Sequence, residues 1–245
     1  MSMLKNQSEM RMKVASICLI FCIYSCSSNS DQSPNPPKAP IETAVSDAEM
    51  KEIYSLISKK HYAKAAEITQ GLLETEPNSD NALLLHFHGF AHKGLFSETR
   101  DIKSRSIAIS SFKKAMESDS TDQLSEQAIP ILNYLSTSLY NDASNIIIEA
   151  DPKTINLAEQ YFYKHKDLAV YLNPEIDFTP KEIGFLLAMS TAFRKISEKS
   201  ETNGEHFKST QEDYLNKVLK LDPNNESAQY SLDVFHHNER LRNLE

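Results

Sequence analysis

Histidines are concentrated in the segment His86-Phe87-His88-Gly89-Phe90-Ala91-His92, where side chains suited to metal chemistry gather. On a helix, His88 and His92 lie one turn apart on the same face, a spacing that suits two ligands of one metal ion, while His86 points elsewhere. A carboxylate would be needed to complete such a site, and none can be identified nearby in the sequence. The pair could instead contact a bound peptide or be partly buried, and we expect neither a metal nor another cofactor.

Sequence motifs of the common enzyme classes are missing. There is no glycine-rich phosphate loop, no Gly-x-Ser-x-Gly and no His-Glu-x-x-His. The chain carries a net charge of −8, whereas affinity for nucleic acid comes from clustered lysine and arginine. We therefore expect a protein that is not an enzyme and has no nucleic-acid partner.

The three cysteines, Cys18, Cys22 and Cys26, all lie near the start of the chain. A basic stretch that ends at Lys13 precedes an uninterrupted apolar run over residues 14–24. This run is too short to cross the roughly 30 Å hydrocarbon core of a membrane as a helix. A basic stretch followed by a short apolar core is typical of a secretory signal sequence.

The end of this run, Ile23-Tyr24-Ser25-Cys26, resembles the bacterial lipobox, although Tyr24 stands where a small or β-branched residue is usual. The resemblance implies cleavage before Cys26 and attachment of diacylglycerol and an N-acyl chain to this residue. Several acyl chains would anchor the protein far more firmly than one. The alternatives are an ordinary cleaved signal with a free Cys26, or an uncleaved anchor.

Residues 27–45 are rich in proline and small polar side chains, a composition that predicts a disordered tether. We therefore divide the chain into a lipoprotein signal peptide (1–25), a lipidated tether (26–45) and a helical domain (46–245). By resemblance to other lipoproteins, the non-acidic Ser27 implies transfer to the outer membrane. We expect the protein in the bacterial cell envelope and facing the periplasm, with the inner membrane and the cell surface as alternatives.

Apolar residues of the domain recur three and four positions apart over long stretches, the pattern of amphipathic helices. Alternating apolar and polar residues, which would indicate strands, are not found, and the chain holds only five glycines and no tryptophan. The fold class predicted by this pattern is all-α.

Two segments of the domain share a helical pattern that leads to a proline turn. Residues 62–68 lead to Glu76-Pro77-Asn78, and residues 214–219 lead to Leu221-Asp222-Pro223-Asn224-Asn225. Proline ends a helix because it lacks an N–H donor and disfavours helical geometry in the residue before it. Both segments resemble the second helix and exit turn of a tetratricopeptide repeat (TPR). The resemblance implies a right-handed superhelical solenoid of about four helix pairs plus a C-terminal capping helix, and an irregular helical bundle is the alternative.

The repeat register assigns core positions to further helices. In the standard repeat, small residues allow close helix contacts, and Ala65 and Ala115 supply two of them here. Thr69 departs from the pattern because an aromatic residue is usual there. The expected core residues are Leu83, His86 and Phe90 before Gly94, then Ala108, Phe112, Ala115, Met116, Leu132, Leu135, Ser136, Leu139, Ala158, Phe162, Ala169, Val170, Leu186, Met189, Ser190 and Phe193.

Three repeats carry extra residues between their helices, at about 95–103, 142–151 and 198–206. In a solenoid such insertions fall on one edge and often form a binding face; alternatively, they only lengthen helices or loops. The second insertion contains the apolar triplet Ile146-Ile147-Ile148, which either enters the core or is an exposed anchor.

Two helix boundaries can be predicted from local signals. Thr179-Pro180-Lys181-Glu182 has the pattern of a capping box with proline in the first turn. Residues 224–245 are expected to form a last helix, apolar at Ala228, Leu232 and Phe235, with a polar end that caps the stack.

In the repeat register, His88, His92, Arg194 and Lys195 would face a concave groove. The two cations could accept an acidic segment or a C-terminal carboxylate, or they could be solvated charges at a helix end. The function that follows is a membrane-anchored scaffold for protein–protein interaction, an adaptor for an envelope protein or peptide in envelope assembly or secretion. The alternative is a transporter-associated helical lipoprotein that binds a solute or metal through His88 and His92.

Overall fold

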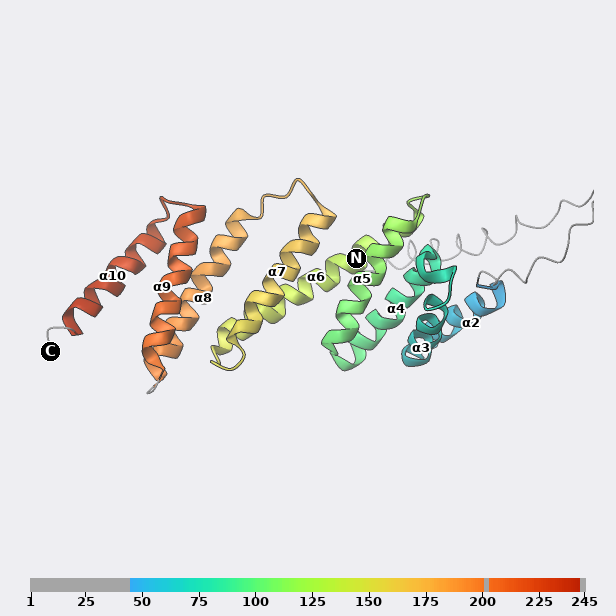
Figure 1. Cartoon of the computed structure of the whole chain (residues 1–245), viewed down its shortest axis with the longest axis horizontal. Helices are drawn as coiled ribbons and strands as arrows, with labels where there is room; N and C mark the ends of the chain where they lie inside the picture. The colour runs from blue at the N-terminus through green and yellow to red at the C-terminus, as the bar shows by residue number, and fades with distance from the viewer. Residues whose placement is uncertain (1–44, 201–202, 243–245) are drawn as a thin grey trace, which may run out of the picture. The chain divides into compact units, whose positions relative to one another are not determined.

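The computed structural model describes residues 45–200 and 203–242, and every regular element in these ranges is helical (Figure 1). The all-α class predicted from the periodicity is therefore confirmed for the described part of the chain. Nine α-helices and one 3₁₀ helix follow one another: α2 (Asp47–Ser58), α3 (Tyr62–Leu73), η2 (Asn78–Asp80), α4 (Ala82–Thr99), α5 (Ile102–Ser118), α6 (Gln123–Glu149), α7 (Ile155–Leu172), α8 (Thr179–Lys199), α9 (Gly204–Leu221) and α10 (Glu226–Arg242).

The helices pack mainly against their neighbours in chain order. The most extensive contacts join α4 to α5, α6 to α7 and α8 to α9, and α3 also packs closely on α4. α2 packs on α3 as the first pair, and the first helix of each pair also contacts the first helix of the next: α2 with α4, α4 with α6 and α6 with α8. A helix in this arrangement needs apolar residues toward its pair partner and toward the next pair, which the three-and-four spacing supplies.

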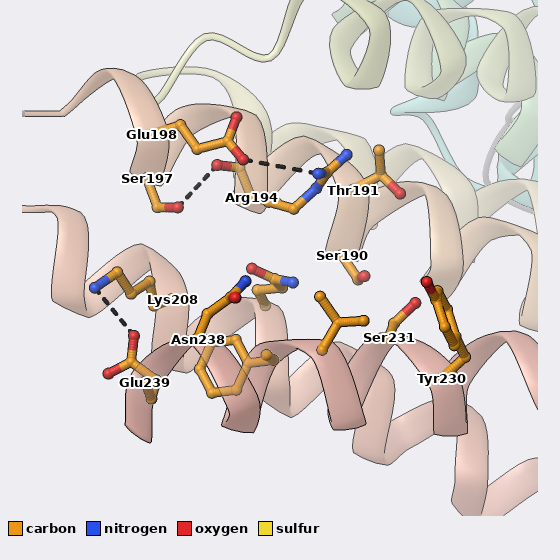
Figure 2. Close-up of a pocket in the computed structure, with 13 residues that line it drawn as sticks. Ser190, Thr191, Arg194, Ser197, Glu198, Lys208, Tyr230, Ser231, Asn238 and Glu239 are labelled. Carbon is orange, nitrogen blue, oxygen red and sulfur yellow. Dashed lines mark hydrogen bonds and ion pairs between the residues drawn. The ribbon is translucent and has the colours of Figure 1, made fainter. Parts of the chain in front are cut away.

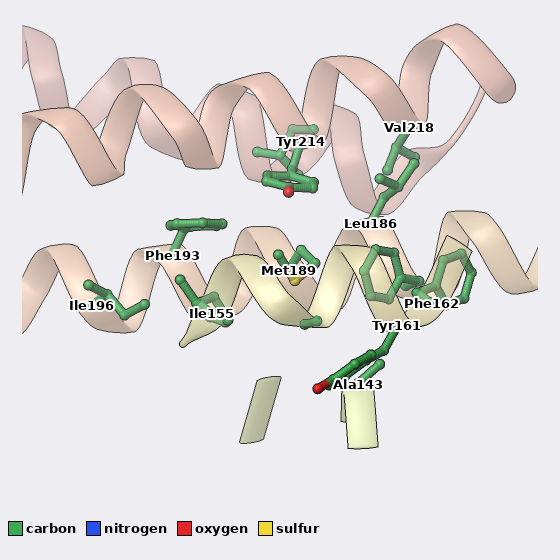
Figure 3. Close-up of a cluster of buried hydrophobic side chains, with 14 of the residues drawn as sticks. Ala143, Ile155, Tyr161, Phe162, Leu186, Met189, Phe193, Ile196, Tyr214 and Val218 are labelled. Carbon is green, nitrogen blue, oxygen red and sulfur yellow. The ribbon is translucent and has the colours of Figure 1, made fainter. Parts of the chain in front are cut away.

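The larger core lies among α6, α7, α8 and α9 (Figure 3). The rings of Phe162 and Phe185 are stacked with centroids 3.9 Å apart, and Phe193 stacks on Tyr214 at 5.4 Å. Fully burying one such side chain contributes roughly 1.5–3 kcal/mol to folding. Most of the core positions expected from the repeat are confirmed as buried: Ala108, Phe112, Ala115, Leu132, Leu135, Ser136, Leu139, Ala158, Phe162, Leu186, Met189, Ser190 and Phe193.

The expected core face of α4 is partly confirmed. His86 is buried and Phe90 packs against a core cluster as expected, but Leu83 is exposed, and Leu84, His88 and Ala91 are buried as well. Gly94 lies inside the helix and does not end it. Glycine is needed here because a Cβ at this position would overlap the ring of Tyr62. α3 and α4 therefore approach each other closely at this point, as small residues were expected to allow at Ala65.

The extra residues between paired helices mostly lengthen the helices. α4 continues to Thr99 and α5 begins at Ile102, so residues expected to form a long connection are helical. α6 likewise continues to Glu149 before a short turn. Arg100 and Ala150 end these helices in the left-handed conformation, with φ of 58° and 49°. A binding face made of long loops is therefore ruled out for the insertions at 95–103 and 142–151.

The apolar triplet 146–148 lies in the last turn of α6, not in a loop. Ile146 and Ile147 pack against the larger core, whereas Ile148 is exposed. Both alternatives thus hold for part of the triplet, since a helix turns successive side chains to different faces.

The start of α8 is at the predicted place, and Pro180 occupies its first turn. The predicted capping box does not form, because Thr179 is already the first residue of the helix and the capping position is held by Phe178, which makes no side-chain capping hydrogen bond. Instead, Asp177 Oδ1 accepts a hydrogen bond from the Thr179 backbone N–H at 3.0 Å. Glu182, the expected reciprocal partner, forms an ion pair with Lys166 at 2.5 Å.

The last helix, α10, packs on α9 through Ala228, which is fully buried, and Leu232 joins the larger core. Asn225 Oδ1 accepts from the Ala228 N–H at 3.1 Å and so satisfies a donor in its first turn. The outer side of this helix is less polar than the sequence pattern suggests, since Tyr230 and Leu241 are exposed.

None of the helices in residues 45–200 and 203–242 combines the length and apolar character that crossing a bilayer requires. The proposed signal peptide, Cys26 and all but the last residue of the proposed tether lie outside the described residues.

Candidate partner-binding groove

A groove of about 450 Å³ lies between α8 and α10, with α9 beside both (Figure 2). We refer to it as the α8–α10 groove. It is lined by Ser190, Thr191, Arg194, Ser197 and Glu198 of α8, Lys208 and Gln211 of α9, and Tyr230, Ser231, Val234, Phe235, Asn238 and Glu239 of α10.

The α8 wall of the groove is polar because α8 has one apolar and one polar face. Phe185, Met189 and Phe193 follow one another at intervals of four and point into the core. Thr191 and Arg194 lie on the remaining face and are exposed. Because the helical period separates the two sets, one helix both anchors the core and presents polar groups to the groove.

The charges in the groove are partly paired. Arg194 Nη1 lies 3.7 Å from Glu198 Oε1 one turn along α8, and both side chains are more than half exposed. An exposed pair of this kind is weak, about 0.3–0.5 kcal/mol, so a ligand carboxylate can compete for the arginine. Lys208 is more buried and contacts both Glu205 and Glu239. Arg194 is therefore the more accessible cation of the two.

The α10 wall adds apolar surface opposite this arginine. Tyr230 is 72% exposed and Val234 is 40% exposed. Figure 2 shows Tyr230 and Ser231 on α10 across from Ser190 on α8. A groove with an accessible guanidinium on one wall and an exposed aromatic ring on the other can hold a chain that carries both carboxylate and apolar side chains.

Of the four predicted partner-binding residues, only Arg194 lines the α8–α10 groove. Lys195 is exposed on α8 but does not line it. His88 and His92 lie on α4, and α6 packs between α4 and α8, contacting each of them. The structure therefore does not bring the two histidines together with the two cations.

The expectation that His88 faces an open groove is wrong. Its side chain is 3% exposed, and Nδ1 lies 2.8 Å from Thr69 Oγ1 on α3. The Thr69 hydroxyl donates to the carbonyl oxygen of Ala65 at 2.7 Å, which leaves its oxygen to accept a hydrogen bond from the Nδ1–H of His88. The departure at Thr69 from the repeat pattern thus has a local cause: it is the partner of a buried histidine.

Burial keeps the histidines of α4 neutral. It lowers the pKa of His88 to about 4, with a smaller contribution from neighbouring His92. The pKa of His92 and that of His86 are also lowered, in each case mainly by burial. The rings of His88 and His92 are 4.5 Å apart and nearly perpendicular. Within the described residues, no three His, Cys, Asp or Glu side chains form a group that could hold a metal ion.

Two of the buried polar residues that the sequence analysis missed carry ionisable side chains. Arg105 continues the core stripe of Ala108 and Phe112 toward the start of α5, and His165 continues that of Phe162 in α7. The helical period therefore placed both side chains in the core, and a polar residue at a core position was the signal that could have identified them.

Two other hollows lie on the surface, one of about 560 Å³ between α5 and α7 and one of about 860 Å³ between α7 and α9. Three of the lysines that line these hollows are engaged within the chain. Lys113 lies 4.3 Å from the centre of the Tyr171 ring, Lys114 pairs with Asp80 at 2.7 Å, and Lys217 lies 4.4 Å from the centre of the Tyr214 ring. The α8–α10 groove is the better candidate because it combines the accessible guanidinium of Arg194 with the exposed ring of Tyr230.

Known proteins do not supply a function for this chain. No family model matches it, and no curated protein or solved structure does so either. The choice of a function therefore depends on the α8–α10 groove and on the sequence of the N-terminal segment.

Proposed function

We propose that this chain is a lipid-anchored protein of the bacterial cell envelope whose helical domain binds a protein partner in the α8–α10 groove. The observation that carries the proposal is the exposed Arg194 on one wall of this groove and the exposed Tyr230 on the other. Arginine and tyrosine are the residue types that most often dominate the energy of protein–protein binding.

The domain is proposed to be a TPR-like, right-handed solenoid. Three observations support this: the helices pack in chain order, nine of them suit four pairs and a final helix, and small residues such as Ala65 and Ala115 are fully buried at helix contacts. In a solenoid of this kind, first helices line the concave face. The groove between α8 and α10, both first helices in this scheme, would then belong to that face.

The partner is proposed to be an envelope protein or peptide with an acidic segment or a C-terminal carboxylate. Its carboxylate would replace Glu198 beside Arg194, and an apolar side chain would pack on Tyr230. A charge-assisted bond of guanidinium to carboxylate is stronger than a neutral one, and it fixes orientation when it is bidentate. The role that follows is that of an adaptor in envelope assembly or secretion.

The anchor is proposed to be the acylated Cys26, in the outer membrane and facing the periplasm. The lipobox-like Ile23-Tyr24-Ser25-Cys26 and the basic and apolar segments before it support this proposal. Replacing Cys26 by serine in the full-length chain should move the protein from the membrane fraction to the soluble fraction or leave its signal uncleaved. Unchanged membrane fractionation and unchanged processing would contradict the lipid anchor.

The groove can be tested by placing a photo-crosslinking amino acid at Thr191 of the full-length chain in living cells. Thr210 is a matched control, because both threonine hydroxyls donate to the carbonyl oxygen four residues earlier, at 3.0 and 2.9 Å, and Thr210 lies in the α7–α9 hollow. We expect one envelope protein crosslinked at Thr191 and lost when Arg194 is replaced by glutamate. Equal crosslinking from both positions, or none at Thr191, would contradict partner binding in this groove.

A further inference from the structure

The side of α10 that is turned away from the core carries an apolar stripe, and two of its residues, Tyr230 and Val234, also line the α8–α10 groove. Tyr230, Val234 and Leu241 are 72%, 40% and 51% exposed, and the exposed His237 lies between the last two. The inner face of the same helix is already used, since Ala228 and Leu232 pack inward. Among the described residues, the one extensive helix contact of α10 is with α9.

The stripe has the spacing of a coiled-coil seam. Ser227, Tyr230, Val234, His237 and Leu241 follow one another at intervals of three, four, three and four. These are the a and d positions of a heptad, which pack between two supercoiled helices. A solvent-exposed helix face does not require this alternation of three and four.

We propose that this face of α10 binds the same face of α10 in a second copy of the chain, in antiparallel orientation. Antiparallel pairing sets a positions of one helix against d positions of the other. Tyr230 then lies opposite Leu241 of the second copy, and Val234 lies opposite its His237. Because the pair is two-fold symmetric, each of these two contacts occurs twice. The two larger apolar side chains thus cover each other.

The charges beside the seam favour the antiparallel pairing. Asp233 and Arg240 occupy the two g positions that flank these layers, and both are exposed. In an antiparallel pair, g positions meet g positions, so Asp233 of each copy meets Arg240 of the other. In a parallel pair, Asp233 would face the uncharged Asn238 and only Arg240 would face an opposite charge, Glu245. The antiparallel pair engages both Asp233 and Arg240, so these charges favour a second copy in that orientation.

The orientation can be tested by chemical crosslinking of full-length chains in their own membrane. Two differently tagged copies are expressed together, one with Val234→Cys and the other with His237→Cys, and treated with a short thiol-to-thiol crosslinker. We expect a product with both tags. Chains without introduced cysteines give the background from Cys18, Cys22 and Cys26. A product formed mainly by Val234→Cys with itself would indicate a parallel pair, and no product above background would also overturn the proposal.

The charge pairing can be tested by reversing each charge. Asp233→Arg and Arg240→Asp each replace two attractive contacts by two repulsive ones and should weaken association of the full-length protein in detergent roughly tenfold. Mixing the two single variants should restore it, because each Arg at 233 or 240 then meets an Asp. Circular dichroism checks that the helices persist. Equal association of all variants, or a monomer at every concentration, would overturn the proposal.

This inference does not depend on the proposed partner in the α8–α10 groove. Thr191 lies on the α8 wall of that groove and His237 lies outside it, whereas Val234 both lines the groove and belongs to the stripe. A second copy and a partner in the groove would therefore share Tyr230 and Val234, but the crosslinks formed at Thr191 and at His237 distinguish them. Loss of crosslinking at Thr191 with an intact product between positions 234 and 237 would reject only the groove. The reverse result would reject only the dimer.

Discussion

The Nη1 atom of Arg105 lies 2.6 Å from Oδ2 of Asp142, although the arginine side chain is only 1% exposed. Ser138 Oγ accepts a second hydrogen bond from the same nitrogen at 3.1 Å. The guanidinium also lies 5.0 Å from the centre of the Phe96 ring and 5.2 Å from that of Tyr161. One side chain of α5 thereby contacts α4, α6 and α7, and ties together two consecutive helix pairs.

Replacing Asp142 by alanine should destabilise the fold, because it leaves the buried guanidinium without its counter-charge. Loss of one partner of a buried pair costs about 3–5 kcal/mol, and the partial exposure of Asp142 reduces this to about 2–3 kcal/mol. Arg105→Met, which removes the charge and keeps the stem, should cost less. Denaturant unfolding followed by circular dichroism measures both free energies of unfolding.

The exposed pair of Arg194 and Glu198 provides the control for this measurement. Glu198→Ala should change the free energy of unfolding by less than about 0.5 kcal/mol. If Asp142→Ala were no more damaging than Glu198→Ala, or less damaging than Arg105→Met, the pair would not stabilise the fold as described.

Stability should fall as the pH falls from about 6.5 to 4. The pKa of His88 and that of His165 are both lowered to about 4, chiefly by burial and, for His165, also by Lys181. The unfolded chain binds protons at these histidines below pH 6.5 while the folded chain does not, so acid favours unfolding. Each histidine should remove about 2 kcal/mol of stability between pH 6.5 and pH 5. Denaturant midpoints across this range give the slope.

Two variants separate this effect from general acid denaturation. His88→Gln keeps a polar group beside Thr69 and should make the pH slope shallower, while the same change at the exposed His237 should not. Equal slopes for the wild type and His88→Gln would show that His88 does not contribute to the pH dependence.

Gly94→Ala and Gly184→Ala should have opposite effects on stability. A Cβ at Gly94 overlaps the ring of Tyr62, whereas one at Gly184 meets no atom within 4 Å. Alanine is a better helix former than glycine by roughly 1 kcal/mol, so Gly184→Ala should raise the melting temperature. Gly94→Ala should lower it by the strain of overpacking, typically about 1–3 kcal/mol.

The cause of the Gly94 effect can be checked with a second change. Tyr62→Val removes the ring, and Gly94→Ala should be far better tolerated in that background. If the two changes were simply additive, the contact between α3 and α4 would not be the reason why glycine is needed at position 94.

Ala150→Gly should stabilise the protein although it removes a methyl group. Ala150 ends α6 with φ of 49° and ψ of 46°, a left-handed conformation that costs a residue with a Cβ roughly 1 kcal/mol. Ala188→Gly, in the interior of α8, should destabilise by about the same amount. Thermal unfolding of both variants measures the two shifts, and shifts of the same sign would contradict the explanation.

The sequence predicted the fold best where the apolar stripes were regular. Leu132, Leu135 and Leu139 in α6 have the three-and-four spacing, and each is buried as expected. The role of Gly94 in α4 could not be found in this way, because it depends on the ring of Tyr62 on another helix. A local pattern cannot distinguish a glycine that ends a helix from one that allows close contact.

The candidate groove was only partly predictable. Arg194 was expected to face a groove and does, because the polar face of α8 follows from its core stripe. The opposite wall was missed, since α10 was expected to be a polar cap and its apolar Tyr230 and Val234 were not considered. The role of His88 could not be read from its own segment, because its partner Thr69 lies on the preceding helix.

The dominance of contacts between helices adjacent in the chain also bears on how fast the native state is reached. A protein whose contacts join residues close in sequence closes only short loops, and such chains fold faster than those that must pair distant segments. α2 and α3 can pack on each other before α10 is in place. Assembly can therefore proceed in chain order, and each new pair finds the previous one already in place to pack against.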